Sequence, residues 1–243
     1  MKRRFAFAAL LVTLALAARL LPGPRTIDDA FITFRYARNL LEGNGFVFNP
    51  GEYVQGTTTP LYTLLMAGLG AINGGSQAPF PLLALWVNSL ADAATCLLLW
   101  SLGRRVSSEA AGAAAGLVWA VAPFSVTFAI GGLETSLYVL LLTGLAWAYL
   151  EKHRRLAALL GVLALLTRPD AILLVGPLLL DRLVRAVWRG ERLQTGELLI
   201  FFLPGLAWAA FATFYFGSPI PHSVTAKLEV YRLGPGESFI RLV

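Results

Sequence analysis

Two adjacent carboxylates, Asp28 and Asp29, are of a type and spacing that could do chemistry, and they directly follow the first long apolar run. Arg35 comes one to two helical turns later. Neighbouring carboxylates at a membrane surface can hold different protonation states, so one of them could act as a general base towards a hydroxyl group. The cation nearby suits a phosphate leaving group. A structural role stays open, because acids in a first helical turn stabilise the helix by ~0.3–1 kcal/mol each.

The two acids begin a segment with helical periodicity. Thr26 suits the N-cap, with an acid three residues later as in a capping box, and Gly43 suits the C′ position. Arg35 and Tyr36 fall in rows that continue from Asp28 and Asp29. The apolar residues at helical spacing are Ile27, Phe31, Phe34 and Leu41. We expect an amphipathic helix that lies along the membrane surface.

The composition indicates whether the elements around this segment lie in water or in a membrane. Of 243 residues, 57% are hydrophobic and 14% are charged, whereas soluble domains are nearer half apolar and a quarter charged. This balance excludes a disordered protein, a fibrous protein and a typical cytosolic enzyme. The net charge of +6 lies in short clusters between apolar runs, which does not indicate nucleic acid as a partner. The single cysteine, Cys96, allows neither an intrachain disulfide nor a cysteine metal site.

Apolar runs recur along most of the chain and are typical of membrane spans. We therefore predict an all-α, polytopic helical membrane protein. A shorter apolar run at 61–72 would cover about 18 Å as a helix, against a hydrocarbon core of about 30 Å, so we predict a re-entrant or interfacial helix there. The seven predicted spans are residues 5–21, 80–102, 110–130, 133–150, 156–167, 171–187 and 198–216, with a first outer loop at 22–79.

Two alternatives concern these boundaries. Residues 5–21 could be a cleaved signal peptide, because Ala15-Leu16-Ala17 resembles a cleavage site, but the many later spans favour an uncleaved signal anchor. Residues 156–180 could form one span, which would place Arg168-Pro169-Asp170 at mid-membrane. Since charged groups are costly there, we predict two short spans that turn at this tripeptide.

Basic residues predict the orientation. More than half of the 20 Lys and Arg residues fall on one side if the amino terminus is cytoplasmic, as the positive-inside rule expects. We count Arg19 with the outer loop. The inner basic residues are Lys2, Arg3, Arg4, Arg104, Arg105, Lys152, Arg154, Arg155, Arg182, Arg185, Arg189 and Arg192.

This orientation places the long polar segments on the outer side. Glu134 begins a span, where capping of the helix dipole is a sufficient explanation, although it could also contact substrate. Arg168 could anchor to lipid headgroups or grip a donor phosphate, and Asp170 could simply pair with Arg168. Lys227 could hold a phosphate as a point charge.

Two further polar groups have ordinary structural explanations. Thr57, Thr58 and Thr59 could contact a sugar, although satisfying the amides at a helix start is the favoured reading. Asn88 and Asp92 lie four residues apart on one face of a span, and we expect them to face the bundle interior and hydrogen-bond between helices.

The outer motifs together resemble bacterial arabinofuranosyltransferase-like membrane glycosyltransferases of the GT-C class. The first-loop blocks Asp28-Asp29-Ala30-Phe31-Ile32-Thr33-Phe34-Arg35-Tyr36-Ala37 and Gly45-Phe46-Val47-Phe48-Asn49-Pro50-Gly51-Glu52 are fairly specific. Three shorter pieces agree in type and order: 132–135, 167–170 and 217–222. His222 departs from the pattern, in which an Asn is commoner.

The resemblance implies a polyprenyl-phosphate sugar donor and a catalytic carboxylate after the first span. Asp28 maps to the general base, and Asp29 to a group that orients it or binds the acceptor. The remaining candidates for substrate binding are Arg35, Tyr36, Glu134, Arg168, Asp170, His222 and Lys227. No cofactor or metal site is indicated. The expected acceptor is an envelope glycan, lipid or protein at the outer face of a bacterial inner membrane, where membrane lipids are further partners.

Two other classes remain as alternatives. A lipid-linked sugar flippase would use polar groups within the membrane, here Asn88 and Asp92. A structural membrane subunit would not explain so many outward charged motifs. Related enzymes continue further, so we expect residues 217–243 to be an outer segment that begins an additional C-terminal part.

Overall fold

The computed structural model describes residues 2–223, and among these residues it contains helices and no strands. Lys227 therefore lies outside the described residues. The α-helices are α1 (Lys2–Leu20), α2 (Ala30–Leu41), α3 (Pro60–Ile72), α4 (Phe80–Val106), α5 (Glu109–Val121), α6 (Pro123–Ile130), α7 (Thr135–Leu150), α8 (Arg154–Thr167), α9 (Ile172–Trp188) and α10 (Thr195–Phe216), with 3₁₀ turns η1 (Gly75–Gln77) and η2 (Pro169–Ala171).

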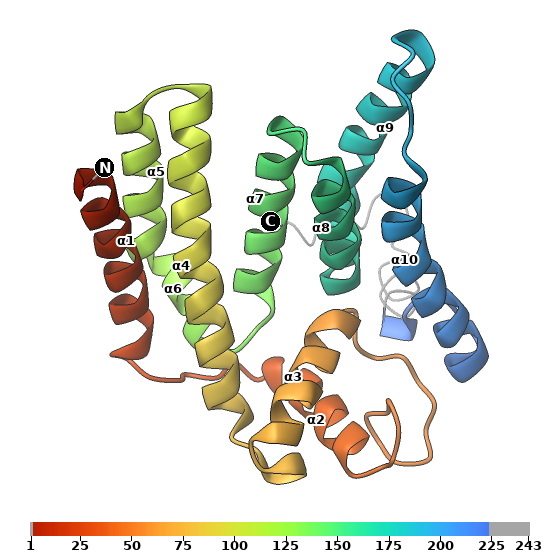
Figure 1. Cartoon of the computed structure of the whole chain (residues 1–243). Coiled ribbons are helices and arrows are strands. Elements are labelled where there is room, and N and C mark those ends of the chain that lie inside the picture. Colours follow the sequence, from red (N-terminus) through yellow and green to blue (C-terminus); the bar gives the residue numbers. More distant parts are fainter. Residues whose placement is uncertain (1, 224–243) are drawn as a thin grey trace, which may run out of the picture.

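The long helices run roughly side by side and give the bundle two ends of different character (Figure 1). At one end, α2 and α3 lie across the bundle, together with the starts of α4, α7 and α9. We call this the motif end, because it holds residues 22–79, 131–134, 168–171 and 217–222. We call the other the basic end; it holds the connections α4–α5, α7–α8 and α9–α10.

The layer at the motif end has an apolar core of its own. Phe34 of α2 stacks on Phe80 at the start of α4, with ring centroids 5.8 Å apart. Tyr62 and Met66 of α3 are fully buried in the same cluster. This packing fixes α2 against the bundle, so that the residues just before α2 have a defined position.

Close approach between α4 and α5 depends on glycine. A Cβ on Gly112 would overlap the carbonyl oxygen of Trp100 and lie 2.9 Å from the amide nitrogen of Arg104. A Cβ on Gly116 would similarly lie 3.0 Å from the carbonyl oxygen of Cys96 and 3.1 Å from the Leu11 side chain of α1. Small residues are typical of helix–helix contacts in membranes, because they let backbones approach closely.

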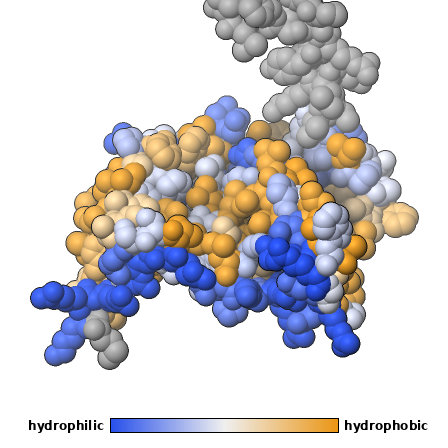
Figure 2. Space-filling model, turned by 90° about the horizontal axis from the view of Figure 1, so that it is seen from above, coloured by the Kyte–Doolittle hydropathy of each residue, from blue (hydrophilic) through white to orange (hydrophobic). Residues whose placement is uncertain are grey.

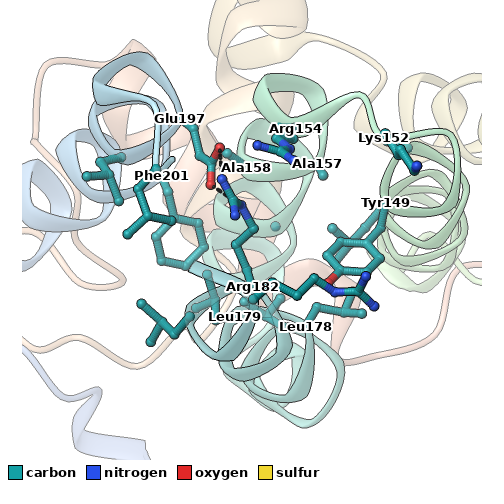
Figure 3. Close-up of a pocket in the computed structure, with 18 of the residues that line it drawn as sticks. Tyr149, Lys152, Arg154, Ala157, Ala158, Leu178, Leu179, Arg182, Glu197 and Phe201 are labelled. Atoms are coloured by element: carbon teal, nitrogen blue, oxygen red, sulfur yellow. Dashed lines mark hydrogen bonds and ion pairs between the residues drawn. The ribbon is translucent and has the colours of Figure 1, made fainter. Parts of the chain in front are cut away.

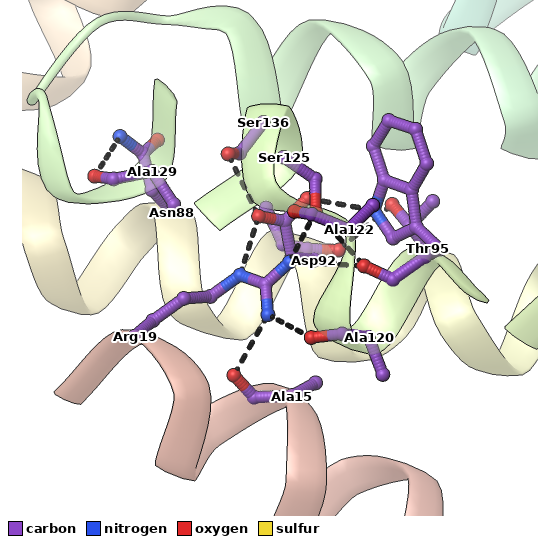
Figure 4. Close-up of polar contacts among 12 residues, drawn as sticks. Ala15, Arg19, Asn88, Asp92, Thr95, Ala120, Ala122, Ser125, Ala129 and Ser136 are labelled. Carbon is purple, nitrogen blue, oxygen red and sulfur yellow. Dashed lines mark hydrogen bonds and ion pairs between the residues drawn. The ribbon is translucent and has the colours of Figure 1, made fainter. Parts of the chain in front are cut away.

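A buried ion pair joins α1 to α4 (Figure 4). Arg19 Nε donates to Asp92 Oδ2 at 2.7 Å, and both side chains are fully buried. Asp92 also accepts from Ser136 at 2.9 Å and from the Trp119 indole at 3.0 Å. Arg19 Nη1 donates to the carbonyl of Ala120 at 2.8 Å. The carboxylate therefore connects α1, α4, α5 and α7.

Two sequence expectations were wrong in detail, and the predicted span at 110–130 is divided. Residues 110–130 form two helices bent by 46°, because Pro123 cannot supply the backbone donor that a continuous helix needs. Helix α2 begins at Ala30, with Asp29 rather than Thr26 at its N-cap position. Arg19 lies inside α1 and not in the outer loop. The predicted interior positions of Asn88 and Asp92 are confirmed, since both are fully buried.

Within residues 2–223, two helices are long and apolar enough to cross a membrane, α4 and α10, and the bent pair α5–α6 makes a third if it counts as one span. Helix α8 has 14 residues and covers about 21 Å, which is short of a hydrocarbon core of about 30 Å. The helices thus indicate a membrane protein. The count of seven spans stays a prediction.

Candidate functional site

Asp28 and Asp29 lie in an exposed turn between the end of α1 and α2. The chain before them is held by two backbone bonds, from Arg25 N to Ile130 O at 2.8 Å and from Ile27 N to Gly131 O at 2.9 Å. The backbone amides of residues 31 and 32 close the turn onto the carbonyls of the two acids. Both carboxylates therefore sit on a fixed turn, open to solvent, beside the α6–α7 connection.

Gly132 explains how closely this turn approaches that connection. Its φ of +80° is a conformation that favours glycine, and a Cβ there would lie 3.3 Å from Phe34 and 3.5 Å from Ala30. Tyr62 also donates to the Gly132 carbonyl at 3.2 Å. Two residues further on, Glu134 precedes α7, so the acid turn and Glu134 belong to one neighbourhood.

Arg168 joins two of the short outer motifs, residues 132–135 and 167–170. Its Nη1 donates to Glu134 Oε1 at 3.2 Å, and its Nε donates to Asp170 Oδ1 at 3.1 Å. The guanidinium also lies over the Tyr138 ring, 5.5 Å from the centroid. Arg168 is held where it is because α8 ends at Thr167 and Pro169 starts the η2 turn. The predicted turn at residues 168–170 is confirmed.

Glu134 is the more buried carboxylate of this cluster, at 7% exposure. Burial raises its pKa, since the charged form loses water, while the Arg168 guanidinium acts in the opposite direction. The pKa of Arg168 is also raised despite its own desolvation, by its bonds to Asp170 and by the charge of Glu134. Both pKa values are raised, which disfavours the charged form of Glu134 and favours that of Arg168, because Glu134 loses more solvation than its ion pair returns.

Arg35 and Tyr36 hold the first loop together. Arg35 Nε donates to the Phe48 carbonyl at 2.8 Å, and its guanidinium lies 4.6 Å from the centroid of the Phe48 ring. Tyr36 is fully buried, and its hydroxyl donates to the Val54 carbonyl and accepts from the Gly56 amide, each at 2.8 Å. Among residues 2–223, Arg35 makes no ion pair with an acid of the Asp28–Asp29 turn.

The hydroxyl-rich segment and His222 meet the same loop. Thr59 Oγ1 lies 3.1 Å from Thr57 Oγ1 and 3.4 Å from Thr33 Oγ1, and all three residues are buried. His222 pairs with the backbone of Gln55, accepting at Nδ1 from its amide at 3.3 Å and donating its own amide at 3.0 Å. The structure thus brings His222 to the first loop. The threonines were expected to satisfy the amides at the start of α3, but Thr59 at the N-cap makes no side-chain bond to them, and Thr57 Oγ1 accepts from the Thr59 amide at 3.2 Å instead.

Tyr62 and Tyr138 contact the site and were not singled out from the sequence. Tyr138 lies four residues after Glu134, so it shares a helix face with that acid, which is a signal that could have identified it. Tyr62 offered no such signal, because it reaches Gly132 through packing of α3 against a distant segment. Within residues 2–223, no three His, Cys, Asp or Glu side chains group in a way that could hold a metal ion.

These features define an α-helical membrane protein. The turn with Asp28 and Asp29 and the cluster of Arg168, Glu134 and Asp170 lie at the same end of it. The chain is similar to the terminal β-(1→2)-arabinofuranosyltransferase of Mycobacterium tuberculosis, with 33% identity over an alignment of 219 residues that covers 82% of this chain. The resemblance to arabinofuranosyltransferase-like proteins indicated by the sequence is confirmed by this match. The chain spans only 34% of the length of that relative. No protein-family model and no solved structure matches.

Proposed function

We propose that the protein is a membrane glycosyltransferase, or the helical part of one. It transfers a sugar from a polyprenyl-phosphate donor to a glycan, lipid or protein of the cell envelope, on the outer face of a bacterial inner membrane. Two facts support the class of reaction: the similarity to a named arabinofuranosyltransferase and the residues at the motif end. The donor, the acceptor and the outer face are inferences from the motifs and the family resemblance.

One observation carries this proposal: chain segments far apart in sequence place the Asp28–Asp29 turn beside the connection that leads to Glu134 and Arg168. The bond from Ile27 N to Gly131 O, at 2.9 Å, links the turn to this connection. The ion pair from Arg168 to Glu134, at 3.2 Å, then links α8 to it. Carboxylates and a cation within one neighbourhood are what a displacement with a phosphate leaving group needs.

In the proposed reaction Asp28 takes the proton from the acceptor hydroxyl, and Asp29 orients Asp28 or binds the acceptor. The hydroxyl oxygen forms a bond to the anomeric carbon as the bond from that carbon to the donor phosphate oxygen breaks. The electron pair of the broken bond stays on polyprenyl phosphate, and the product has inverted configuration. The exposure of both carboxylates leaves them accessible to an acceptor that arrives from solvent.

Arg168 is suited to hold the donor phosphate. Its contacts with acids in residues 2–223 use Nε and Nη1, so the N–H groups of Nη2 stay open for a phosphate oxygen. Lys227 would add a second cation. We propose this binding without a required metal ion.

The orientation follows from the distribution of charge. Basic residues of four separate segments meet at the basic end, opposite the acid turn (Figure 1). The positive-inside rule then assigns the basic end and the amino terminus to the cytoplasm. The motif end faces outward, where a lipid-linked donor and an envelope acceptor would meet.

The flippase alternative loses support from the contacts of Asn88 and Asp92. Asp92 is occupied by Arg19, Ser136 and Trp119, and the Asn88 amide donates to the carbonyls of residues 129 and 133. A carrier needs such groups to be free for substrate within the membrane. The partners of Asp92 and of the Asn88 amide nitrogen instead give these groups a structural role, while the buried Asn88 Oδ1 has no hydrogen-bond partner among residues 2–223.

A reconstituted assay separates the two functions. The full-length protein is placed in vesicles that contain a synthetic polyprenyl-phosphate arabinofuranose, with matched mannose and ribose donors as a specificity panel. We expect a new glycosidic bond on an added oligosaccharide acceptor, detected by mass spectrometry. Movement of intact donor between leaflets without a new glycosidic bond would overturn the proposal and support the carrier.

A further inference from the structure

A cavity of about 390 Å³ lies between α7, α8, α9 and α10 in the half of the bundle towards the basic end (Figure 3). Its walls are mostly alanine, leucine and phenylalanine side chains, among them Ala157, Leu178 and Phe201. Arg154, at the mouth of this cavity, lies 14 residues before Arg168, which is about 21 Å along α8, and the apolar lining continues along α8 to Gly161. One donor phosphate cannot reach both Arg154 and Arg168, so the basic mouth of the cavity is distinct from the proposed phosphate site.

Ion pairs within the protein already satisfy three of the cations around the cavity. Arg182 Nε donates to Glu197 at 2.8 Å and Arg154 Nη2 donates to Glu191 at 2.6 Å. Arg185 also lines the cavity and pairs with Asp181 at 2.7 Å. These pairs hold α8, α9 and the connection before α10 together at the mouth, and they carry no net charge.

Two further cations at the mouth have no such partner. Within residues 2–223 neither Lys152 nor Arg155 makes an ion pair. The Arg155 side chain lies near the first turn of α10, where a Cβ on Gly196 would be 3.3 Å from its Nε. Lys152 has a φ of +61°, a conformation that usually favours glycine. A lysine at this position therefore strains the backbone more than a glycine would.

These cations line a second, open hollow of about 630 Å³, which shares Lys152 and Arg154 with the apolar cavity. Its other polar lining residues include His153, Arg155 and Gln194, and no acid lines it. Trp147, a residue type enriched at membrane interfaces, lines it as well. An apolar cavity therefore opens beside a basic hollow, and blue hydrophilic atoms border this face in Figure 2.

We propose that the joined hollows bind a phospholipid with a net negative headgroup from the leaflet at the basic end. An acyl chain occupies the apolar cavity, and the headgroup phosphate lies against Lys152 and Arg155. Charge complementarity selects this occupant. A zwitterionic headgroup carries a positive group that would be repelled by Lys152 and Arg155, whereas a net negative headgroup is attracted to both. The site serves lipid recognition and is separate from sugar transfer.

Photocrosslinking in nanodiscs tests the proposal with the full-length protein. The probes are phosphatidylglycerol and phosphatidylcholine with the same photoactivatable acyl chain, each a minor component in phosphatidylcholine. We expect phosphatidylglycerol to label peptides from α8 to α10 several-fold more than phosphatidylcholine does. The double variant Lys152→Gln/Arg155→Gln should remove this preference. Each lost positive charge should lower the labelling by phosphatidylglycerol by about fivefold. The matched control Lys2→Gln/Arg3→Gln, with the same charge change at the same end, should retain it.

A second pair of variants tests the cavity without changing charge. Ala158→Phe fills it and should abolish the labelling, whereas Ala114→Phe on an exposed face of α5 should not. Equal labelling by the two lipids, or equal loss in the Lys2/Arg3 control, would overturn the proposal. So would stronger competition by unlabelled polyprenyl phosphate than by unlabelled phosphatidylglycerol, which would assign the cavity to the donor lipid.

Discussion

Glu134 combines burial with a single cationic neighbour, so it loses its proton in a higher pH range than an exposed acid does. Burial raises its pKa in the folded protein, while the unfolded chain has the ordinary value. Between these two values the folded state binds more protons than the unfolded state. Stability from this group is therefore complete at low pH and is lost as pH rises through the raised pKa.

Glu134→Gln removes this titration and should flatten that part of the stability profile. Thermal unfolding of wild type and variant in the same detergent, over a pH series, measures it. We expect the melting temperature of the wild type relative to Glu134→Gln to fall as pH rises through the window. A constant or increasing difference would show that the Arg168 ion pair, and not burial, controls this carboxyl group.

The buried pair of Arg19 and Asp92 predicts a large penalty for breaking one side. Asp92→Leu should destabilise the protein by about 3–5 kcal/mol, because it leaves the Arg19 guanidinium buried without its carboxylate. The double variant Arg19→Met/Asp92→Leu removes both charges and should recover much of this loss. Unfolding in detergent would contradict the account if the double variant were as unstable as the sum of both single variants.

For single residues, the sequence identified candidate site residues better than it identified the residues that they contact. Asp28, Asp29, Glu134 and Arg168 could be named from their position in polar segments between apolar runs. The Arg19–Asp92 pair was missed, because Arg19 lies at the end of an apolar run and its partner is 73 positions away. Arg35 and Tyr36 were expected to bind substrate, and their present contacts brace the first loop.

Among the elements, α4 and α5 depend on glycine for their contact. Gly112→Leu would force the helices apart at Trp100, and we expect a loss on the order of 1–3 kcal/mol with a lower melting temperature. Gly68→Ala is the matched control, since nothing lies within 4 Å of its added Cβ. That variant should be neutral or stabilise α3 by up to about 1 kcal/mol. A Gly112→Leu protein as stable as Gly68→Ala would rule out this contact as a determinant of packing.

Proline shows where element boundaries could be read from the sequence. The cost of charges at mid-membrane predicted the turn at residues 168–170, and Pro169 begins η2 there. The same residue type at position 123 was included within one span, although it bends that segment by 46°. Hydropathy alone does not reveal such a break, because both halves are apolar. The angle depends on how α5 and α6 pack against α1 and α4.

In the whole molecule, the polar segments with the family motifs lie at the motif end, and the short basic connections lie at the basic end. Alternating apolar runs dictate this arrangement, since every second connection returns to the same end. The sequence predicted it from basic residues alone, without any distances. The cavity near the basic end was not predictable, because it results from the gap between α7, α8, α9 and α10 and not from a local motif.

The central claim is that a carboxylate of the acid turn is the general base in sugar transfer. The most direct measurement is the transfer rate of Asp28→Asn and Asp29→Asn in the full-length protein, with a synthetic polyprenyl-phosphate arabinofuranose donor. Glu42→Gln, a change of an exposed acid elsewhere in the first loop, is the control. We predict that Asp28→Asn lowers the rate by about 10²–10⁴-fold while Glu42→Gln leaves it unchanged. Full activity in both aspartate variants would contradict the account.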